Sequence, residues 1–368
     1  MTNLTIAFDP GSTLSRAFYT GSEFDPKLML MEPEVLPVPR ASIEAYEANQ
    51  LGDPDPKDAA WVAYSNGNRC RAVGYLAQTQ FRGSAGLAQP KFEQATDKVL
   101  ALVGAIAQRE SLPSQFKLSL GILLPWGEYQ DREFLERQLY QALAEFEFRG
   151  QPLSVTLEQF HCLPEGGGLL TRGLPPDAST DCARAIVMLG YRNASVLAFE
   201  RGALQRGDTS ELGFARLVEK VSDRCSVPAQ ALAQRICEAG QKMRPKAFAQ
   251  LARSSDPQLQ QEECEGIARA VETARAEYWS MLEAWFREVL PAQLDEVVLS
   301  GGTANYLAPE LKQHFAGIEL NWCERTEDSV SAGFGDRLPH RLADAYTFFF
   351  YLHHQIKQKE VADARAAN

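Results

Sequence analysis

The order of apolar and polar residues follows two different periods along this chain. Short apolar runs, of the kind that form buried strands, alternate with longer segments in which an apolar residue returns every three or four positions, the spacing of an amphipathic helix. The apolar runs cover residues 4–8, 17–19, 61–64, 118–124, 186–189, 195–199 and 296–300. The helical pattern covers residues 92–106, 135–150, 267–289, 306–313 and 341–352. This alternation predicts an α/β fold.

A polar segment that contains prolines, residues 173–181, divides the chain into two halves. Each half begins with an apolar run, a turn and a second apolar run, as the start of a new domain does. The 368 residues also exceed what one hydrophobic core normally holds. We therefore expect two domains.

Composition excludes several classes of protein. The 37 basic and 48 acidic residues give a net charge of −11, which disfavours a broad basic face for direct binding of nucleic acid. The N-terminus lacks the pattern of a signal peptide, and the densest apolar stretch, Phe348–Leu352, is far shorter than the ~20 residues of a membrane helix. The seven cysteines are scattered without a C-x-x-C pair, which disfavours a zinc site or a disulfide framework. We expect a cytoplasmic protein with no membrane span.

The first segment with recognisable chemistry follows the first apolar run. Asp9 stands at the end of that run, and Gly11, Ser12 and Thr13 form a turn before the next strand, which begins near Arg16. Such a turn presents backbone N–H groups and two hydroxyls to phosphate oxygens. An aspartate at the strand end can hold a hydrated Mg²⁺, because this ion keeps several waters and takes few protein ligands. The same residue types also make an ordinary β-turn.

A second segment of this kind lies near the end of the chain. The apolar run Glu296–Ser300 leads into Gly301 and Gly302, and then through Thr303 and Asn305 into a helical segment. Two glycines at this place let a nucleoside or a phosphate approach the backbone, and a helix N-terminus favours negative charge. Neither G-x-G-x-x-G nor G-x-x-x-x-G-K-[ST] occurs, so the Rossmann and P-loop motifs are missing.

Together, the two segments resemble the first phosphate loop and the adenosine loop of the superfamily that contains actin, sugar kinases and DnaK chaperones. Two further stretches lie between them. Cys162–Gly168 resembles the Pro-Glu motif of ParM-type bacterial actins, whose glutamate, here Glu165, positions the water that attacks the γ-phosphate. Leu124–Arg132 is similar to the Leu-Pro-x-x-Glu-Tyr-x-Asp-Arg stretch of the same proteins. The order of the motifs covers nearly the whole chain, although each match is short.

The second phosphate loop departs from the pattern of the superfamily. It falls at Gly190, Arg192 and Asn193, between two apolar runs. The family usually has an aspartate two residues before this glycine, where this chain has Met188, and Tyr191 stands where a second glycine is common. The resemblance therefore predicts that ATP hydrolysis is impaired more than ATP binding. Arg192 offers the phosphates a positive charge instead.

The resemblance also suggests residues beside the adenine. Arg235, Glu238 and Lys242 follow one another at spacings of three and four, so they share one helical face. In the superfamily a helix at this place flanks the adenine, which makes Glu238 and Lys242 candidates to contact it. A solvated charged face is the simpler interpretation.

The resemblance implies an actin-like (ribonuclease H-like) fold with a nucleotide cleft between two domains, residues 1–172 with about 336–368, and residues 181–335. The segment 341–352 would pack on the first domain. The cofactors implied are ATP or ADP with Mg²⁺, the metal being held by Asp9 through water, and the catalytic residues are Glu165 and Asp9.

The function implied is that of a ParM-like actin homologue that assembles head-to-tail filaments. Its cellular role would be cytoskeletal, or the segregation of plasmid DNA through a separate DNA-binding adaptor protein. Two alternatives stay open. One is a nucleotide-binding scaffold that does not hydrolyse ATP, which Met188 and Tyr191 favour. The other is a sugar or acid kinase of the same superfamily, for which no clear aspartate base is found. The sequence does not separate ATP from GTP.

Overall fold

The computed structural model describes residues 3–64, 69–87, 89–172, 182–241, 243–336 and 338–366. The chain divides into two compact units, of which unit 1 combines Met1–Pro175 with Arg325–Asn368 and unit 2 spans Pro176–Glu324. The segment 173–181, where the sequence places the domain boundary, lies outside the described residues. Unit 1 resumes earlier than the expected limit near 335, because Val330 packs in one apolar cluster with Phe18 and Phe349. The limits of the expected domains stay a prediction.

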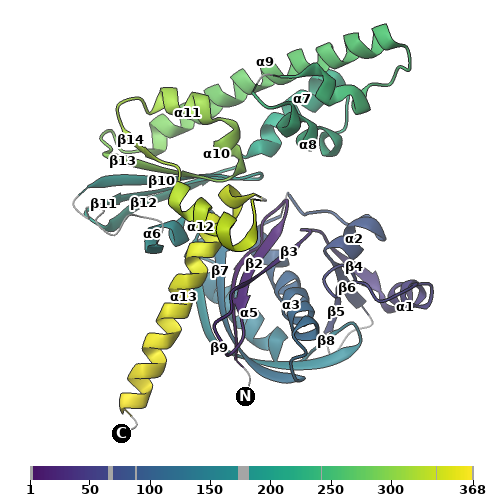
Figure 1. Cartoon of the computed structure of the whole chain (residues 1–368), viewed down its shortest axis with the longest axis vertical. Coiled ribbons are helices and arrows are strands. Elements are labelled where there is room, and N and C mark those ends of the chain that lie inside the picture. Colours follow the sequence, from purple (N-terminus) through teal and green to yellow (C-terminus); the bar gives the residue numbers. More distant parts are fainter. Residues whose placement is uncertain are drawn as a thin grey trace. The chain divides into compact units, whose positions relative to one another are not determined.

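Unit 1 contains a sheet in the order β3-β2-β1-β7-β9-β8-β5-β6-β4 (Figure 1). Its strands are β1 (Asn3–Asp9), β2 (Ser15–Thr20), β3 (Lys27–Met31), β4 (Val35–Pro39), β5 (Trp61–Tyr64), β6 (Arg69–Val73), β7 (Gln115–Leu124), β8 (Phe146–Phe148) and β9 (Gln151–Pro164). The strands expected at 4–8, 17–19, 61–64 and 118–124 are confirmed. Because β7 pairs in parallel with both β1 and β9, the carboxyl ends of these three strands lie at one edge of the sheet.

The helices of unit 1 cover both faces of the middle of this sheet. They are α1 (Arg40–Ala48), α2 (Tyr75–Thr79), α3 (Lys91–Arg109), α4 (Trp126–Tyr129), α5 (Arg132–Ala144), α6 (Gly167–Arg172), α12 (Glu324–Phe334) and α13 (Pro339–Ala366). Side chains of a strand alternate between faces. In β1, Ile6 and Phe8 belong to the apolar cluster that includes α3 and α5, and Ala7 belongs to the cluster that includes α13. Strands covered on both faces need continuous apolar runs, as the sequence has.

The apolar block near the C-terminus packs on the sheet of unit 1, as expected. Phe348, Phe349 and Leu352 are completely buried in α13. The ring of Phe349 lies 6.3 Å from that of Phe18 in β2. No helix in the described part of the chain is both long and apolar enough to span a membrane.

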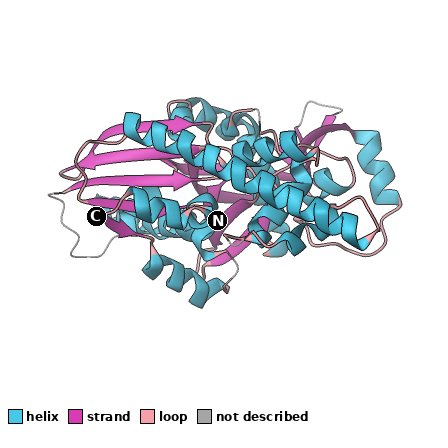
Figure 2. Ribbon diagram, turned by 90° about the horizontal axis from the view of Figure 1, so that it is seen from above, coloured by secondary structure: helices cyan, strands magenta, loops and turns pink. Residues whose placement is uncertain are grey.

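Unit 2 contains a second sheet in the order β12-β11-β10-β13-β14. Its elements are β10 (Ala183–Leu189), β11 (Ala194–Glu200), β12 (Ala203–Ser210), α7 (Phe214–Cys225), α8 (Ala229–Ala239), η1 (Pro245–Leu251), α9 (Pro257–Val289), β13 (Glu296–Ser300), α10 (Gly302–Tyr306), α11 (Ala308–His314) and β14 (Glu319–Asn321). One apolar cluster joins the helices α7 to α11 to the strands β10, β11 and β13. Figure 2 shows all helices of the chain in cyan and all strands in magenta. The antiparallel pairing of β10 with β11 confirms the two strands expected there.

Two helix predictions were wrong at their ends. The helix expected to reach residue 150 ends at Ala144, and Phe146 and Phe148 pair with β5 and β9 as strand β8. The helical spacing stops at Leu143, after which burial alternates with the period of a strand. The helix expected at 306–313 begins at Gly302 and is interrupted at Leu307. There Pro309, which suits the first turn of a helix, starts α11.

Candidate functional site

The parallel strands of unit 1 bring two of the expected acidic residues to the same edge. Asp9 is the last residue of β1, and Glu165 follows the last residue of β9. The strand between them, β7, ends at Leu124, whose carbonyl accepts a hydrogen bond of 2.7 Å from the Glu165 N–H. In open α/β sheets, ligands bind beyond the carboxyl ends of the strands. We call the group of side chains at this edge, which includes Asp9 and Glu165, the unit 1 half-site.

The turn between β1 and β2 has the tight form that the sequence indicates. Asp9 and Arg16 face each other in the β1–β2 register, and the Arg16 guanidinium forms an ion pair with the Asp9 carboxylate. A Cβ atom on Gly11 would lie 2.4 Å from the Leu14 carbonyl oxygen, so no larger residue fits there without movement. Thr13 accepts a hydrogen bond from Arg341 of α13.

A lysine that the sequence interpretation missed joins the two acids. The Lys91 ammonium forms an ion pair with Glu165 and lies 3.6 Å from Asp9 Oδ1. Only 9% of the Lys91 side chain is exposed, against 11% for Asp9 and 12% for Glu165. Three side chains from β1, the start of α3 and the end of β9 therefore form one buried ionic group.

The charges of this group hold one another in the ionised state. Burial raises the pKa of Asp9, but the attraction of Arg16 and Lys91 outweighs it, so the pKa lies below its usual value. Burial lowers the pKa of Lys91, but Glu165 and Asp9 outweigh it, so the pKa lies above its usual value. Both side chains are thus charged near neutral pH.

A third carboxyl group, from α13, lies against the loop after β9. Asp344 Oδ2 accepts a hydrogen bond of 2.7 Å from the Gly166 N–H. Burial, with smaller contributions from Asp9 and Glu165, raises the pKa of Asp344 to about 7. Its Oδ1 is buried and has no hydrogen-bond partner among the described residues. Asp344 is therefore the acid of the half-site that gains or loses a proton near neutral pH.

The residues at this edge can hold a hydrated divalent cation only if an anion binds together with it. Within the described ranges, no group of three or more Asp, Glu, His or Cys side chains is arranged to hold a metal ion directly. Asp9 Oδ1 is buried without a hydrogen-bond partner in the described chain, so it can accept a hydrogen bond from a metal-bound water. Arg16, at Oδ2, and Lys91, near Oδ1, place two positive charges beside this carboxylate. A polyphosphate would offset them.

In unit 2, backbone groups form the expected second turn. The Gly190 N–H donates to the Asn193 carbonyl over 2.9 Å, which closes the turn between β10 and β11. Arg192 Nε donates to the Asn193 side chain over 3.2 Å. Thr303 Oγ1 donates to the Gly190 carbonyl over 2.8 Å, and so ties the loop after β13 to this turn. We call these two loops the unit 2 half-site.

The glycine that opens the loop after β13 has a structural reason to be there. Gly301 adopts φ +99°, a conformation that other residues rarely adopt, and a Cβ atom on it would lie 2.3 Å from the Leu189 carbonyl oxygen. Gly302 begins α10, and the exposed Asn305 lies on the same short helix. The loop after β13 therefore packs closely on the end of β10 through its backbone.

Methionine occupies the position where the superfamily usually has an aspartate. Met188 is half-buried in β10, opposite Ser195 of β11 and Ser300 of β13. Tyr191 packs on Phe214, with 6.2 Å between the ring centroids. The turn of unit 2 thus combines a thioether, an aromatic ring and a guanidinium.

The remaining candidates lie on or beyond helix α8. Glu238 is exposed and forms an ion pair with Arg235 and a hydrogen bond of 2.7 Å with Gln234, all on the same helix. These contacts match the simpler interpretation of the charge pattern, in which this helix face is exposed to solvent. Lys242 lies outside the described residues.

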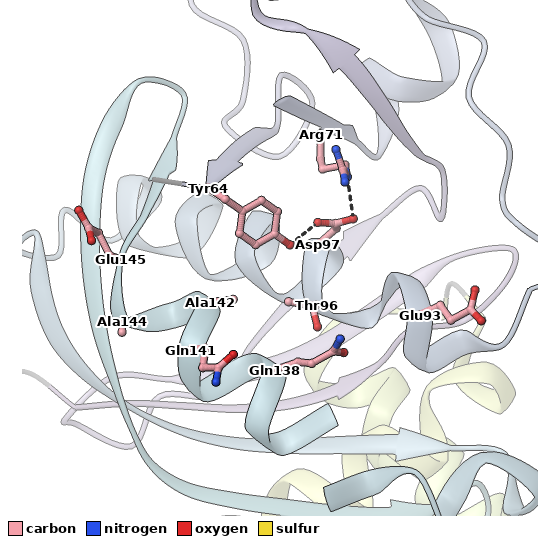
Figure 3. A pocket seen from close by; sticks show the side chains of 10 residues that line it. All are labelled: Tyr64, Arg71, Glu93, Thr96, Asp97, Gln138, Gln141, Ala142, Ala144 and Glu145. Carbon is pink, nitrogen blue, oxygen red and sulfur yellow. Dashed lines mark hydrogen bonds and ion pairs between the residues drawn. The ribbon is translucent and has the colours of Figure 1, made fainter. Parts of the chain in front are cut away.

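A polar groove in unit 1 offers a different chemistry from the half-site. Its volume is about 610 Å³ (Figure 3). Its lining residues are Tyr64, Arg71, Glu93, Thr96, Asp97, Gln138, Gln141, Ala142, Ala144 and Glu145. Tyr64 donates a hydrogen bond of 2.5 Å to Asp97, and Arg71 pairs with the same carboxylate, as the dashed lines show. With three acids against one arginine, the groove is unsuited to a polyphosphate.

Comparisons with known proteins show the fold. No protein-family model matches the sequence, and no curated protein is similar to it in sequence. Among solved structures, the actin-like protein Alp7A matches with 13% identity and a TM-score of 0.67 over 99% of both chains. The archaeal actin homologue Ta0583 in complex with ADP matches with 13% identity and a TM-score of 0.58, over 92% of this chain and 98% of that chain.

Two further solved structures are similar to this chain. The filament structure of AlfA from B. subtilis plasmid pLS32 matches with 13% identity and a TM-score of 0.53, over 95% of this chain and 98% of that chain. The psk41 ParM protein is another match. The actin-like fold that the sequence motifs predicted is therefore confirmed.

Proposed function

We propose that this chain, which has the actin-like fold, is an ATP-binding protein that assembles into nucleotide-dependent filaments. In this proposal the unit 1 half-site binds phosphates, and the two loops of the unit 2 half-site are the groups of that unit that contact a nucleotide. The assembled and the free protein would have different conformations, and the bound nucleotide would shift the equilibrium between them.

The observation that carries the proposal is the ionic group of the unit 1 half-site. Asp9, Arg16, Lys91 and Glu165 converge from four segments at the carboxyl edge of the sheet, next to the tight turn between β1 and β2. Burying this many charges is costly for folding, and hydrophobic residues of the same size would serve stability as well. A requirement for binding a charged ligand explains why the group is present.

Two of the solved structures support the ligand and the assembly in this proposal. The archaeal homologue Ta0583 has been solved with ADP, and AlfA as a filament. The Mg²⁺ expected from the sequence would enter with the phosphates and be held through its waters at Asp9 Oδ1, where it would offset phosphate charge. Because the net charge of −11 disfavours direct binding to DNA, any role in plasmid segregation would need a separate DNA-binding adaptor.

Sedimentation and light scattering with ATP, with ADP and without nucleotide test the proposal. We expect pelletable filaments with ATP at micromolar protein, and little or no pellet with ADP. Asp9→Asn serves as the matched variant, since it keeps the shape of the side chain but removes the carboxylate that holds the Arg16 guanidinium in place and that would hold the waters of Mg²⁺. It should weaken ATP affinity in calorimetry at least tenfold, about 1.4 kcal/mol. A chain that stays monomeric under every condition would refute filament assembly.

A slow or absent ATPase activity is the second candidate, and Met188 favours it. A thioether neither accepts a strong hydrogen bond nor offsets the charge of a metal. Loss of a group that orients water or metal commonly slows a reaction by about 10²–10⁴. If this loss limits the rate, Met188→Asp should speed phosphate release while ATP affinity stays the same. The sugar or acid kinase alternative would instead show phosphate transfer to a substrate in a coupled assay.

A further inference from the structure

Lys91 has an unusual position for a cation. It is the first residue of α3, where the helix dipole favours negative charge, and Pro90 precedes it. A lysine at an exposed helix start would extend into water. Here the ammonium is buried instead, between Glu165 and Asp9.

The surrounding structure fixes this position. The N–H of the next residue, Phe92, donates a hydrogen bond of 3.1 Å to Glu128 Oε2, and Glu128 is itself buried. Ala95 and Val99, one and two turns later, are completely buried in the main core of unit 1. The stretch around Leu124–Arg132, which the sequence analysis singled out, therefore anchors the start of α3. The backbone of Lys91 cannot move far without breaking this anchor.

The other two cations of the half-site, Arg16 and Arg341, make different contacts. Arg16 pairs with Asp9 alone among the acids of the half-site, and Arg341 is bonded to Thr13 in the phosphate turn. Lys91 is the cation that reaches both Asp9 and Glu165, and so links the ends of β1 and β9. A divalent cation that bound both carboxylates directly would have to displace the Lys91 ammonium, which already contacts each of them.

We propose that Lys91 is a built-in cation of the phosphate site that takes over part of the electrostatic role of Mg²⁺. This deepens the proposed nucleotide-binding function and rests on it. Without nucleotide, Lys91 neutralises Asp9 and Glu165 and excludes divalent cations from them. With nucleotide, its ammonium faces the phosphates, so ATP affinity depends only weakly on Mg²⁺.

The first experiment uses Mg²⁺ or Mn²⁺ alone and needs no nucleotide. The thermal midpoint of the wild-type protein should stay unchanged when millimolar metal is added. Lys91→Met exposes the two carboxylates to each other, so its midpoint should fall, and metal should then raise it by at least about 3 °C. Lys91→Arg keeps the charge and should behave as wild type. Lys91→Gln is the neutral substitute if Lys91→Met does not fold.

A matched control is available on the same sheet. Lys117 pairs with Glu158 between β7 and β9, at a partly exposed place. Lys117→Met should show no response to metal. Metal stabilisation of the wild type equal to that of Lys91→Met would overturn the proposal, and so would a neutral variant that ignores metal.

The second experiment measures ATP affinity with Mg²⁺ and with EDTA. Removing Mg²⁺ should weaken ATP binding to the wild type by less than about tenfold, and to Lys91→Met by at least about a hundredfold. Equal ratios in both proteins would refute the role of Lys91 towards the phosphates. If the wild type binds no ATP at all, the proposed function fails, while the metal experiment still decides whether Lys91 excludes divalent cations.

Discussion

The two half-sites of this molecule differ in the chemical groups that form them. In unit 1, charged side chains converge on one edge of the sheet, where Lys91 joins Asp9 to Glu165. In unit 2, backbone groups and one hydroxyl close the turn, with Gly190 bonded to Asn193 and to Thr303, and Arg192 is the charged side chain of that turn. Both positions follow the same local plan, a strand, a tight turn and an antiparallel return strand.

The difference concerns how each half-site can be altered. A charge in unit 1 can be replaced by a neutral residue of similar shape, so binding is separable from folding there. The turn of unit 2 depends on the absence of a side chain at Gly301, so its geometry and the packing of β10 are inseparable. Substitutions of the charges in unit 1 should therefore change ligand binding as well as stability, and substitution of Gly301 in unit 2 should change stability first. The following predictions test this contrast.

The largest effect should come from Gly301→Ala. The new Cβ would lie 2.3 Å from the Leu189 carbonyl, in a backbone conformation that alanine rarely adopts. Strain of this kind together with overpacking costs on the order of 3 kcal/mol. Urea unfolding should show this loss without any nucleotide. In the control, Gly266→Ala in α9, the added Cβ meets no atom within 4 Å, and the helix should gain stability. Equal stability of both variants would show that the loop after β13 does not depend on the absence of a side chain at Gly301.

Local patterns predicted most of the fold and part of the site. Strand β1 and the turn after it are coded within Asn3–Arg16, so the motif identified Asp9, Gly11 and Arg16 without any distant contact. The end of α5 was missed because pairing of Phe146 with strands far away in sequence outweighs the local helical spacing.

Side chains that reach the half-site from other elements could not be found in the same way. Lys91 directly precedes one helical pattern, Arg341 and Asp344 lie within another, and their approach to β1 depends on how α3 and α13 pack. One signal was present: Lys91 follows Pro90 at the start of a helix, where a cation is electrostatically misplaced. Such a misplaced charge indicates a partner elsewhere in the fold. For Glu238 the structure shows an exposed ion pair with Arg235, and its contact with the adenine stays a prediction.

A smaller effect, dependent on pH, should come from Asp344→Asn in unit 1. The pKa of Asp344 is raised from 3.8 to about 7 in the folded protein. Below the lower value the carboxyl is neutral in both states. Between the two values the unfolded chain loses its proton while the folded protein keeps it, so the stability that this group contributes falls as the pH rises, and it is lost above about 7.

Asparagine stays neutral, and its amide oxygen can still accept the hydrogen bond from Gly166. Asp344→Asn should therefore gain stability over wild type as the pH rises from about 5 to about 8, by at least about 1 kcal/mol. Urea unfolding at several pH values measures the difference. A constant difference across that range would show that Asp344 is already ionised in the folded protein.

The smallest effect should come from Glu238→Ala, which tests whether the charged face of α8 belongs to the unit 2 half-site. Glu238 is exposed, and its partners Arg235 and Gln234 lie on the same helix. Hydrogen bonds from these two residues lower the pKa of Glu238, as they would at any solvated helix surface. Ion pairs of this kind contribute little, and alanine is the better helix former. ATP affinity of Glu238→Ala should stay within about twofold of wild type, measured by calorimetry beside Asp9→Asn. A tenfold loss would instead place the face of α8 at the adenine, and the unit 2 half-site would then depend on a charge after all.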